Sequence, residues 1–576
     1  MIRRATLLLL LASMLLGAAS PAAARTTAPS ATTSTAPIPV PASSVPPAGR
    51  RLSANQVLAI AGALPKMRAV RREYRGSFSG AYLKPPLHWQ VSFFARGGKK
   101  EIGQVTIDDL SGRVLEQWTG FQVAWSMARG YPGAFGRHAN ALYVWLPLCV
   151  LFVLPFLNFR RPLSLGNLDL LVLLSFSISL AFFNHANIYA SVPLVYPPLV
   201  YLLVRMLLLL RRGRGVARRP PPLRLLVPAS WLAVAVVFLL GFRIGLNVTD
   251  SNVIDVGYAG VIGAQRITTD RPLYGHYPSD NERGDTYGPV NYEAYVPFEQ
   301  VFGWSGTWDD LPAAHAAAIA FDLLAVALLF LLGRRMRGPT LGVALAYGWV
   351  AYPFTLFSLA SNANDSLVAA LVIAALLAAS YRSRLAPAAR GATAALAGLT
   401  KFAPLALAPI LATHDLLGRR AVPASRRAAA LALFAIGFVV VGAVALVPAL
   451  THDSLHTIYE RTIAYQANRG SPFSVWGLYG GLGGLQLAVQ VAAVALAIGL
   501  AVIPRRDDIV GLAAACAAVL IALQLGIEHW FYLYIPWFFP LVLIALFGRF
   551  SERAAGPAAG ASAPARSSRP AAAVST

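Results

Sequence analysis

The chain has 576 residues, of which 56% are hydrophobic and only 13% are charged, and its mean hydropathy is +0.57. A soluble domain carries about a quarter of charged residues, so the composition indicates a polytopic membrane protein. The formal charge of +24 could suggest nucleic acid binding. The basic residues, however, lie in short clusters between apolar runs, as in the cytoplasmic loops of membrane proteins. We therefore expect the lipid bilayer, and no nucleic acid, as a partner.

Both ends of the chain have compositions that do not predict a folded domain. Residues 1–24 follow the pattern of a signal peptide, since Arg3 and Arg4 precede a Leu-rich core that ends in small residues. Residues 25–50 are rich in Ala, Pro, Ser and Thr and are interpreted as a disordered linker. Residues 551–576 have a similar composition and predict a disordered cytoplasmic tail. Cys149 and Cys516 lie in apolar runs, so no disulfide framework is expected.

Residues 51–136 predict a small exported α+β domain. Residues 57–64 have helical spacing, residues 87–94 and 103–107 alternate like strands, and a turn at 108–112 leads into a strand at 113–118. The segments WQVSFF and VTIDDLSGRVLEQW resemble a PepSY-like domain. This domain shows no metal-ligand or nucleophile arrangement, so we expect a packing or regulatory module.

Residues 137–550 alternate apolar runs with loops and predict an all-α membrane domain. The Arg-rich loops are expected in the cytoplasm, which leaves residues 184–192, 247–312, 361–365 and 451–484 and the region near Glu528 outside. Residues 391–413 are flanked by Arg on both sides, so we expect a re-entrant pair of half-helices broken near Lys401. About eleven spans then follow the exported domain. Within one span, His315 and Asp322 share a helical face and predict a cavity or an ion pair.

The polar loop at residues 247–300 is the centre of the functional prediction, because its many Tyr and Pro residues are not typical of disorder. Asp255 lies early in this loop, Tyr258 follows it, and PLYG stands at residues 272–275. This order resembles the integral-membrane glycosyltransferases of the GT-C superfamily, in particular the glycosyltransferase family 87-like branch that uses polyprenyl-phosphate mannose. TYGPVNYEAYVPF, SNANDSLVAALVIAALL and GLTKFAPLALAP are also similar to that branch, so the resemblance covers roughly residues 250–540.

The resemblance implies that Asp255 is the catalytic base. A carboxylate that takes the proton of an attacking sugar hydroxyl contributes about 10² to 10⁴ in rate. The alternatives are that Asp255 only caps a helix at residues 256–267, or that Asp250 or Asp285 is the base. The residues expected to bind substrate are Tyr258, Tyr274, Asp285, Tyr287, Asn364, Asp365, Ser471 and Trp476. For Asn364 and Asp365, helix capping is the competing interpretation.

The second large outer loop and the start of the last span supply the expected contacts to the donor phosphate. Arg461 and Arg469 can make bidentate, charge-assisted contacts to a lipid phosphate, and His529 can hold or protonate it. The competing interpretations are exposed arginines at the membrane surface and an interfacial aromatic belt around His529. No metal and no cofactor are expected.

We therefore predict a multi-pass enzyme of a bacterial-type plasma membrane, with its active site and N-terminal domain on the outer face. It would transfer a hexose, with mannose as the first choice, from a polyprenyl-phosphate sugar to a glycan, glycolipid or protein acceptor, with inversion. The rival hypothesis is a lipid or polysaccharide transporter or flippase without catalysis. A transporter places ionisable residues near the bilayer midplane on interrupted helices, and only the break near Lys401 matches that description.

Overall fold

The computed structural model of the chain describes residues 37–130, 135–211, 223–306, 308, 310–414, 416, 423–503 and 506–550. The predicted signal peptide, the first part of the predicted linker and the predicted tail lie outside these residues. The chain divides into two compact units, Met1–Thr119 and Gly120–Thr576. Residues 120–130, which the sequence analysis includes in the exported domain, lie in the second unit.

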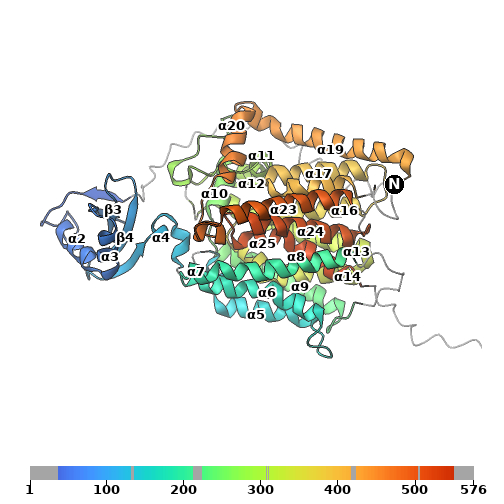
Figure 1. The fold of residues 1–576 in the computed structure, drawn as a ribbon, viewed down its shortest axis with the longest axis horizontal. Helices are drawn as coiled ribbons and strands as arrows, with labels where there is room; N and C mark the ends of the chain where they lie inside the picture. Colours follow the sequence, from blue (N-terminus) through green and yellow to red (C-terminus); the bar gives the residue numbers. More distant parts are fainter. Residues whose placement is uncertain are drawn as a thin grey trace, which may run out of the picture. The chain divides into compact units, whose positions relative to one another are not determined.

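The first unit is an α+β domain with one five-stranded antiparallel sheet in the order β1-β2-β3-β4-β5 (Figure 1). Its elements are β1 (Ile38–Val40), α2 (Ala54–Ala63), α3 (Pro65–Glu73), β2 (Phe78–Lys84), β3 (His88–Phe94), β4 (Glu101–Asp108) and β5 (Val114–Thr119). Trp89 is fully buried, and its indole N–H donates to the Asp109 carboxylate at 2.8 Å. The predicted helix and its three strands are thus confirmed. The PepSY-like resemblance stays a prediction.

Local chemistry explains where these elements begin and turn. Ser53 and Gln56 form a capping box at the start of α2, so two backbone N–H groups at this helix end are satisfied. In the predicted turn, the Asp108 carboxylate accepts the amide of Ser111 at 2.8 Å, and Gly112 has φ +69, which favours glycine. The edge strand β1 comes from residues that the composition predicts to be disordered. That prediction is wrong for Ile38–Val40, because these residues pair with β2.

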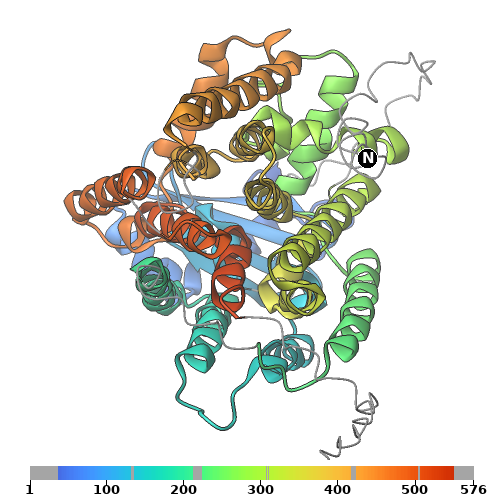
Figure 2. The ribbon, with the colours of Figure 1, turned by 90° about the vertical axis from the view of Figure 1, so that its right-hand side faces the viewer.

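The second unit is a bundle of apolar helices, seen across their length in Figure 1 and along it in Figure 2. In the described residues, seven helices are long and apolar enough to cross a membrane, and one bent pair is an eighth candidate. The seven are α6 (Leu165–Asn184), a helix of which α8 (Tyr196–Arg211) is the main part, α9 (Ala229–Thr249), α13 (Pro312–Arg337), α19 (Ala424–Leu450), α23 (Gly483–Val502) and α24 (Ile509–Gly526). The bent pair is α14 (Pro339–Ala351) with α15 (Pro353–Ala360).

The all-α class of the membrane domain is confirmed, whereas the span count stays a prediction. Eleven spans also require three shorter apolar helices to cross, namely α5 (Leu142–Val153), α16 (Asp365–Ala379) and α25 (Ile535–Phe547). α24 packs against α8, α23 and α25 and is the most buried span candidate, while α19 is largely exposed.

Buried ion pairs lie inside the bundle. Asp169 accepts two hydrogen bonds from the Arg205 Nε and Nη2 atoms, the shortest of 2.8 Å, and Arg243 binds Asp322 at 2.6 Å. Asp322 also accepts the indole N–H of Trp349. Burial of an ion is costly unless it is paired and hydrogen-bonded, so these contacts stabilise the bundle. For Asp322, the predicted pair is confirmed.

Residues 386–414 leave one end of the bundle and return to it. α17 (Ala386–Thr400) ends at Lys401, which bonds Asp365 at the first residue of α16, and the chain turns back through α18 (Ala408–Ala412). Arg384 and His414, which flank the segment, line one cavity. The break near Lys401 is therefore confirmed, whereas re-entry of this segment into the membrane stays a prediction. α17 packs closely on α19, because a Cβ atom at Gly391 would lie only 2.0 Å from the carbonyl oxygen of Phe434.

The long loop after α9 is folded, as its aromatic content predicts. It contains α10 (Asp255–Thr268), α11 (Pro289–Glu293) and α12 (Val296–Phe302) around a separate core. In Figure 1 these helices gather with α20 (Leu455–Tyr459) at one end of the bundle. The core of this end contains five tyrosines, Tyr258, Tyr274, Tyr277, Tyr292 and Tyr295.

Candidate functional site

Asp255 is the first residue of α10 and lies beside the start of α16. The chain before it is extended, and the amides of Asn252 and Ile254 donate to the carbonyl oxygens of Ala360 and Ser361 at 3.2 and 3.3 Å. These two bonds bring the beginning of the loop that follows α9 to the segment that precedes α16. The loop and α16 therefore contribute to the same site.

The Asp255 side chain is reached by solvent and is nevertheless surrounded by protein. Both observations fit a carboxylate that faces a recessed, water-accessible space. Burial raises the pKa of Asp255, the positive charges of Arg469 and Lys401 oppose the rise, and the negative charge of Asp365 adds to it. A raised pKa makes this carboxylate a better proton acceptor near neutral pH.

Lys401 is a site residue that the sequence analysis treats only as a helix break. Its Nζ lies 2.6 Å from the Asp365 Oδ1 atom and 5.1 to 5.4 Å from the ring centres of Trp537 and Tyr287. The Asp365 Oδ1 atom also accepts the Trp537 indole N–H at 2.7 Å. The signal in the sequence is a single lysine in the otherwise apolar GLTKFAPLALAP. A buried lysine requires a partner, and Asp365 supplies it.

Arg469 is the second cation near Asp255. Its guanidinium lies 5.6 Å from the centre of the Trp125 ring. Within the described part of the chain it makes no hydrogen bond or ion pair with another side chain. Its hydrogen-bond donors are therefore available to a ligand, as a phosphate contact requires.

His529 packs against the same tryptophan. Its ring lies 5.9 Å from that of Trp125 in a stacked arrangement, and its Nδ1 atom is 2.9 Å from the Ser471 Oγ atom. Burial lowers the pKa of His529 well below its ordinary value, and the charges of Arg469 and Lys401 lower it further. The imidazole is thus neutral at neutral pH. It can hold a phosphate by a hydrogen bond, but it does not supply a proton as an imidazolium.

Arg461 does not share this environment, which argues against the predicted phosphate contact. Its Nε and Nη2 atoms lie 2.6 and 2.9 Å from the two carboxylate oxygens of Asp285, and Nη2 also donates to the Glu282 carbonyl. The hydrogen bonds to Asp285 raise the pKa of Arg461. The Nε/Nη2 edge of the guanidinium, which could otherwise take a phosphate, already binds a buried carboxylate.

The same pairing explains Asp285, which is predicted as a substrate residue and as a substitute base. Asp285 is fully buried and also accepts the amide of Gly275 at 2.6 Å. Gly275 has φ +79, and the Asp453 carboxylate accepts the amides of Leu273 and Tyr274. Two carboxylates therefore hold the PLYG turn in place. Asp285 is a positioning residue of the loop.

Several other predicted substrate residues are internal to the folded loops. Tyr258 is buried, donates to Asp280 at 3.0 Å and stacks on Trp308, and Tyr274 is buried with its hydroxyl bonded to the Tyr287 carbonyl. Their exposed fractions of 2% and 1% leave no surface for a substrate. Of the three tyrosines, only Tyr287 faces Lys401.

Asn364 and Trp476 make internal contacts, and Asp250 is engaged elsewhere. The Asn364 side-chain amide donates to Asn291 deep in the protein, without capping α16, and the Trp476 indole donates to the Leu525 carbonyl at 2.9 Å. Asp250, the other substitute for the base, accepts from the amide and the ring of His138. Asp255 therefore remains the candidate base of this loop, and the positive charges of Arg469 and Lys401 act on it.

Trp125 is a site residue that sequence reasoning missed. It lies in residues 120–130, which carry no motif, and it contacts Arg469, His529 and Phe473. Its contact partners come from far along the chain, so no local signal indicates them. The described residues contain no group of three or more His, Cys, Asp or Glu side chains suited to share a metal ion.

Comparisons with known proteins find a family similarity for part of the second compact unit. The sequence model described as "Glycosyltransferase family 87" matches residues 286–526. No curated protein matches the chain. Among solved structures, the crystal structure of ArnT from Cupriavidus metallidurans bound to undecaprenyl phosphate is similar at 16% identity, with a TM-score of 0.38. The match covers 56% of this chain and 60% of that chain, so this chain spans less than two thirds of the ArnT structure.

The family match is less than half of the chain and contains Asp365, Lys401 and Arg469, whereas Asp255 precedes it. The low TM-score of the ArnT match does not by itself establish a shared fold. The matched residues include the segments TYGPVNYEAYVPF, SNANDSLVAALVIAALL and GLTKFAPLALAP, which begin at Thr286, Ser361 and Gly398. These are three of the segments on which the resemblance is based. Over these residues the chain is thus similar to glycosyltransferase family 87.

Proposed function

We propose that this protein transfers a hexose, with mannose as the first choice, from a polyprenyl-phosphate sugar to a glycan, glycolipid or protein acceptor on the outer face of the membrane. The observation that carries the proposal is a solvent-reached carboxylate, Asp255, whose pKa is raised by burial and lowered in part by the positive charges of Arg469 and Lys401. The carboxylate can take the proton of an acceptor hydroxyl. The two cations can neutralise the charge of a leaving phosphate.

In the proposed step, the acceptor hydroxyl attacks the anomeric carbon of the donor while Asp255 takes its proton. A new carbon–oxygen bond to the acceptor forms as the bond to the phosphate oxygen breaks, so the configuration inverts. The polyprenyl phosphate leaves with the bonding electron pair and with added negative charge. General-base catalysis of this kind contributes about 10² to 10⁴ in rate.

Arg469 and Lys401 would stabilise the charge that develops on the leaving phosphate. Arg469 offers a planar fork that matches two phosphate oxygens, and Lys401 offers a point charge already oriented by Asp365. Fixed cations aimed at developing charge are an effective way to lower a transition state, because they need no reorganisation during the reaction. His529 and Ser471 form a neutral hydrogen-bonding pair beside them.

The test is Asp255→Asn, which keeps the shape of the side chain and removes its ability to take a proton. Transfer of labelled sugar from a polyprenyl-phosphate donor to extracted membrane acceptors should fall by at least about 10². Donor binding should be retained, because the lost contribution acts in the transition state. Asp250→Asn is the matched control from the same loop and should keep most of the activity. Near-normal turnover of Asp255→Asn would show that the base is elsewhere.

The broken segment around Lys401 favours a second candidate, a flippase for the same lipid. Interrupted helices with a charged residue at the break are common in transporters. A wild-type protein that binds the donor and moves it across vesicle membranes, but never transfers sugar to any acceptor, would support this alternative against the proposed enzyme.

A further inference from the structure

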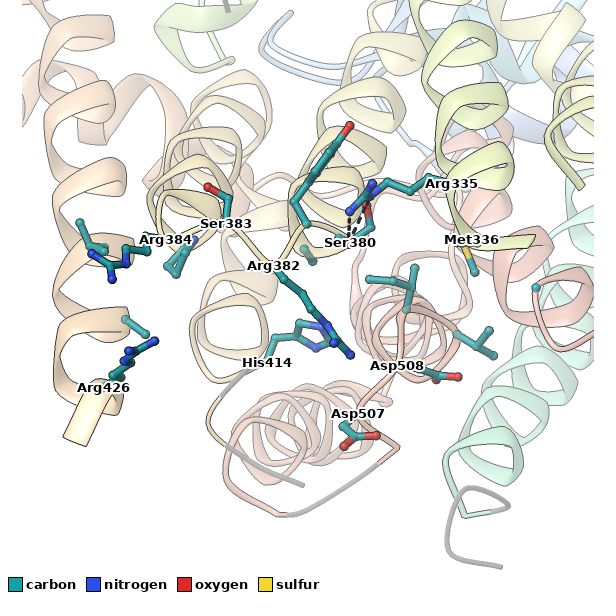
Figure 3. A pocket seen from close by; sticks show the side chains of 18 of the residues that line it. Arg335, Met336, Ser380, Arg382, Ser383, Arg384, His414, Arg426, Asp507 and Asp508 are labelled. Atoms are coloured by element: carbon teal, nitrogen blue, oxygen red, sulfur yellow. Dashed lines mark hydrogen bonds between the residues drawn. The ribbon is translucent and has the colours of Figure 1, made fainter. Parts of the chain in front are cut away.

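A second charged region lies at the other end of α16 from the candidate site. Asp365 is the first residue of this 15-residue helix, and residues 380–384 follow its last turn. A helix of that length spans about 22 Å. Residues 380–384 line a cavity of about 1080 Å³ together with the ends of α13, α19 and α24 (Figure 3). This region is therefore separate from the Asp255 site.

The lining of this cavity is strongly basic. Five arginines face two aspartates, namely Arg335, Arg337, Arg382, Arg384 and Arg426 against Asp507 and Asp508. Figure 3 shows that the labelled arginines, Arg335, Arg382, Arg384 and Arg426, come from several segments, with Arg382 and His414 in the middle of the view. Like charges brought together repel one another, so an anion that binds here relieves that repulsion.

Not all of these arginines are already neutralised. Arg335 bonds to Ser380 and stacks on Tyr381 at 3.6 Å. Asp508 is held by Arg506 and by the first turn of α24. Within the described residues, the guanidinium groups of Arg382, Arg384 and Arg426 make no hydrogen bond or ion pair. Three arginine forks are thus free to bind phosphate oxygens.

The cavity adjoins a surface suited to acyl chains. α19 begins at the cavity and carries exposed Leu431, Ile436 and Val439, which is typical of a lipid-facing helix. Leu433, Met336 and Ile509 add apolar surface to the lining. A headgroup in the cavity would therefore leave its acyl chains along α19. The arginine distribution predicts that this end faces the cytoplasm, where anionic lipids attract basic residues.

We propose that this cavity binds the phosphate headgroup of an anionic membrane lipid. A free phosphate or diphosphate in solution has the same recognition chemistry. The lipid is the better occupant because the first turns of α19 line the cavity and the same helix carries exposed apolar side chains. The proposal does not depend on the reaction at Asp255.

The experiment uses the full chain in nanodiscs of phosphatidylcholine with a minor fraction of phosphatidylglycerol. Native mass spectrometry should detect phosphatidylglycerol bound to the wild type. The double variant Arg382→Gln with Arg426→Gln should lose at least about tenfold in lipid affinity, since one basic residue near a membrane contributes about fivefold. The variant Arg382→Lys with Arg426→Lys keeps both charges but removes the planar guanidinium groups. An intermediate loss of lipid affinity is therefore expected.

The matched control is Arg160→Gln with Arg161→Gln. These arginines are exposed, lie in a loop predicted to face the same side, and do not line the cavity. Retained lipid binding in this control supports the proposal, whereas an equal loss would show only general attraction of the surface. Inorganic pyrophosphate forms the second arm. If it binds the wild type and the lipid does not, the site takes a soluble anion and the proposal is wrong.

Discussion

The contrast between Arg469 and Arg461 gives the sharpest test of the candidate site. Arg469 has no side-chain ion pair among the described residues, so Arg469→Gln removes only the contact to the donor phosphate and the stacking on Trp125. A hydrogen bond to a charged group contributes about 1.5 to 3 kcal/mol. kcat/KM should therefore fall by about 10- to 150-fold, with the thermal unfolding temperature nearly unchanged.

Arg461→Gln should show the opposite pattern. It leaves the fully buried Asp285 without its cation, and removal of one partner of a buried pair costs about 3 to 5 kcal/mol of stability. Both variants are compared by transfer from a polyprenyl-phosphate sugar over a range of donor concentrations and by thermal unfolding in the same detergent. If Arg469→Gln keeps normal kcat/KM, or if folded Arg461→Gln loses donor affinity without loss of stability, our assignment of the two arginines is wrong.

Three further predictions follow from the same contacts. Because burial raises the pKa of Asp255 and Arg469 opposes the rise, activity should fall as the pH drops through that raised pKa, and Arg469→Gln should move the acid limb of the pH–rate profile to higher pH. Trp125→Ala should lower kcat/KM by about 2- to 30-fold through loss of the cation–π contact, with Trp125→Phe nearer to wild type; equal activity of all three proteins would contradict this. Single cysteines next to Arg384 and His414 should both resist a membrane-impermeant thiol reagent in intact cells, and labelling at only one would contradict the half-helix assignment.

The position of Trp125 decides where a deletion of the N-terminal domain should end. A deletion that extends through residue 130 removes a residue of the site, whereas one that ends at Thr119 removes only the first compact unit. We expect the shorter deletion, from residue 52 to Thr119, to keep measurable transfer activity. Complete loss in a well-folded deletion protein would mean that the α+β domain contributes to donor or acceptor binding.

Much of the architecture follows from local patterns in the sequence. Apolar run lengths give the all-α membrane class, and period-two alternation gives the strands at residues 87–94 and 103–107. Arginines on both flanks of residues 391–413 predict a segment that turns back, since one crossing would place one flank on the wrong side. The order of motifs also indicates Asp255 as the candidate base. These features are local or depend on order along the chain, so the sequence is sufficient to determine them.

The partners of the polar side chains depended on the tertiary structure. Arg461 and Arg469 look equivalent in the sequence, yet one binds buried Asp285 and the other lies near Asp255. The sequence indicates only a helix break at Lys401, whereas the tertiary structure pairs this lysine with Asp365. Whether a charge is neutralised depends on which residue, often more than a hundred positions away, lies within about 3 Å of it. Local periodicity holds no information on such distances, and only the packed helices decide them.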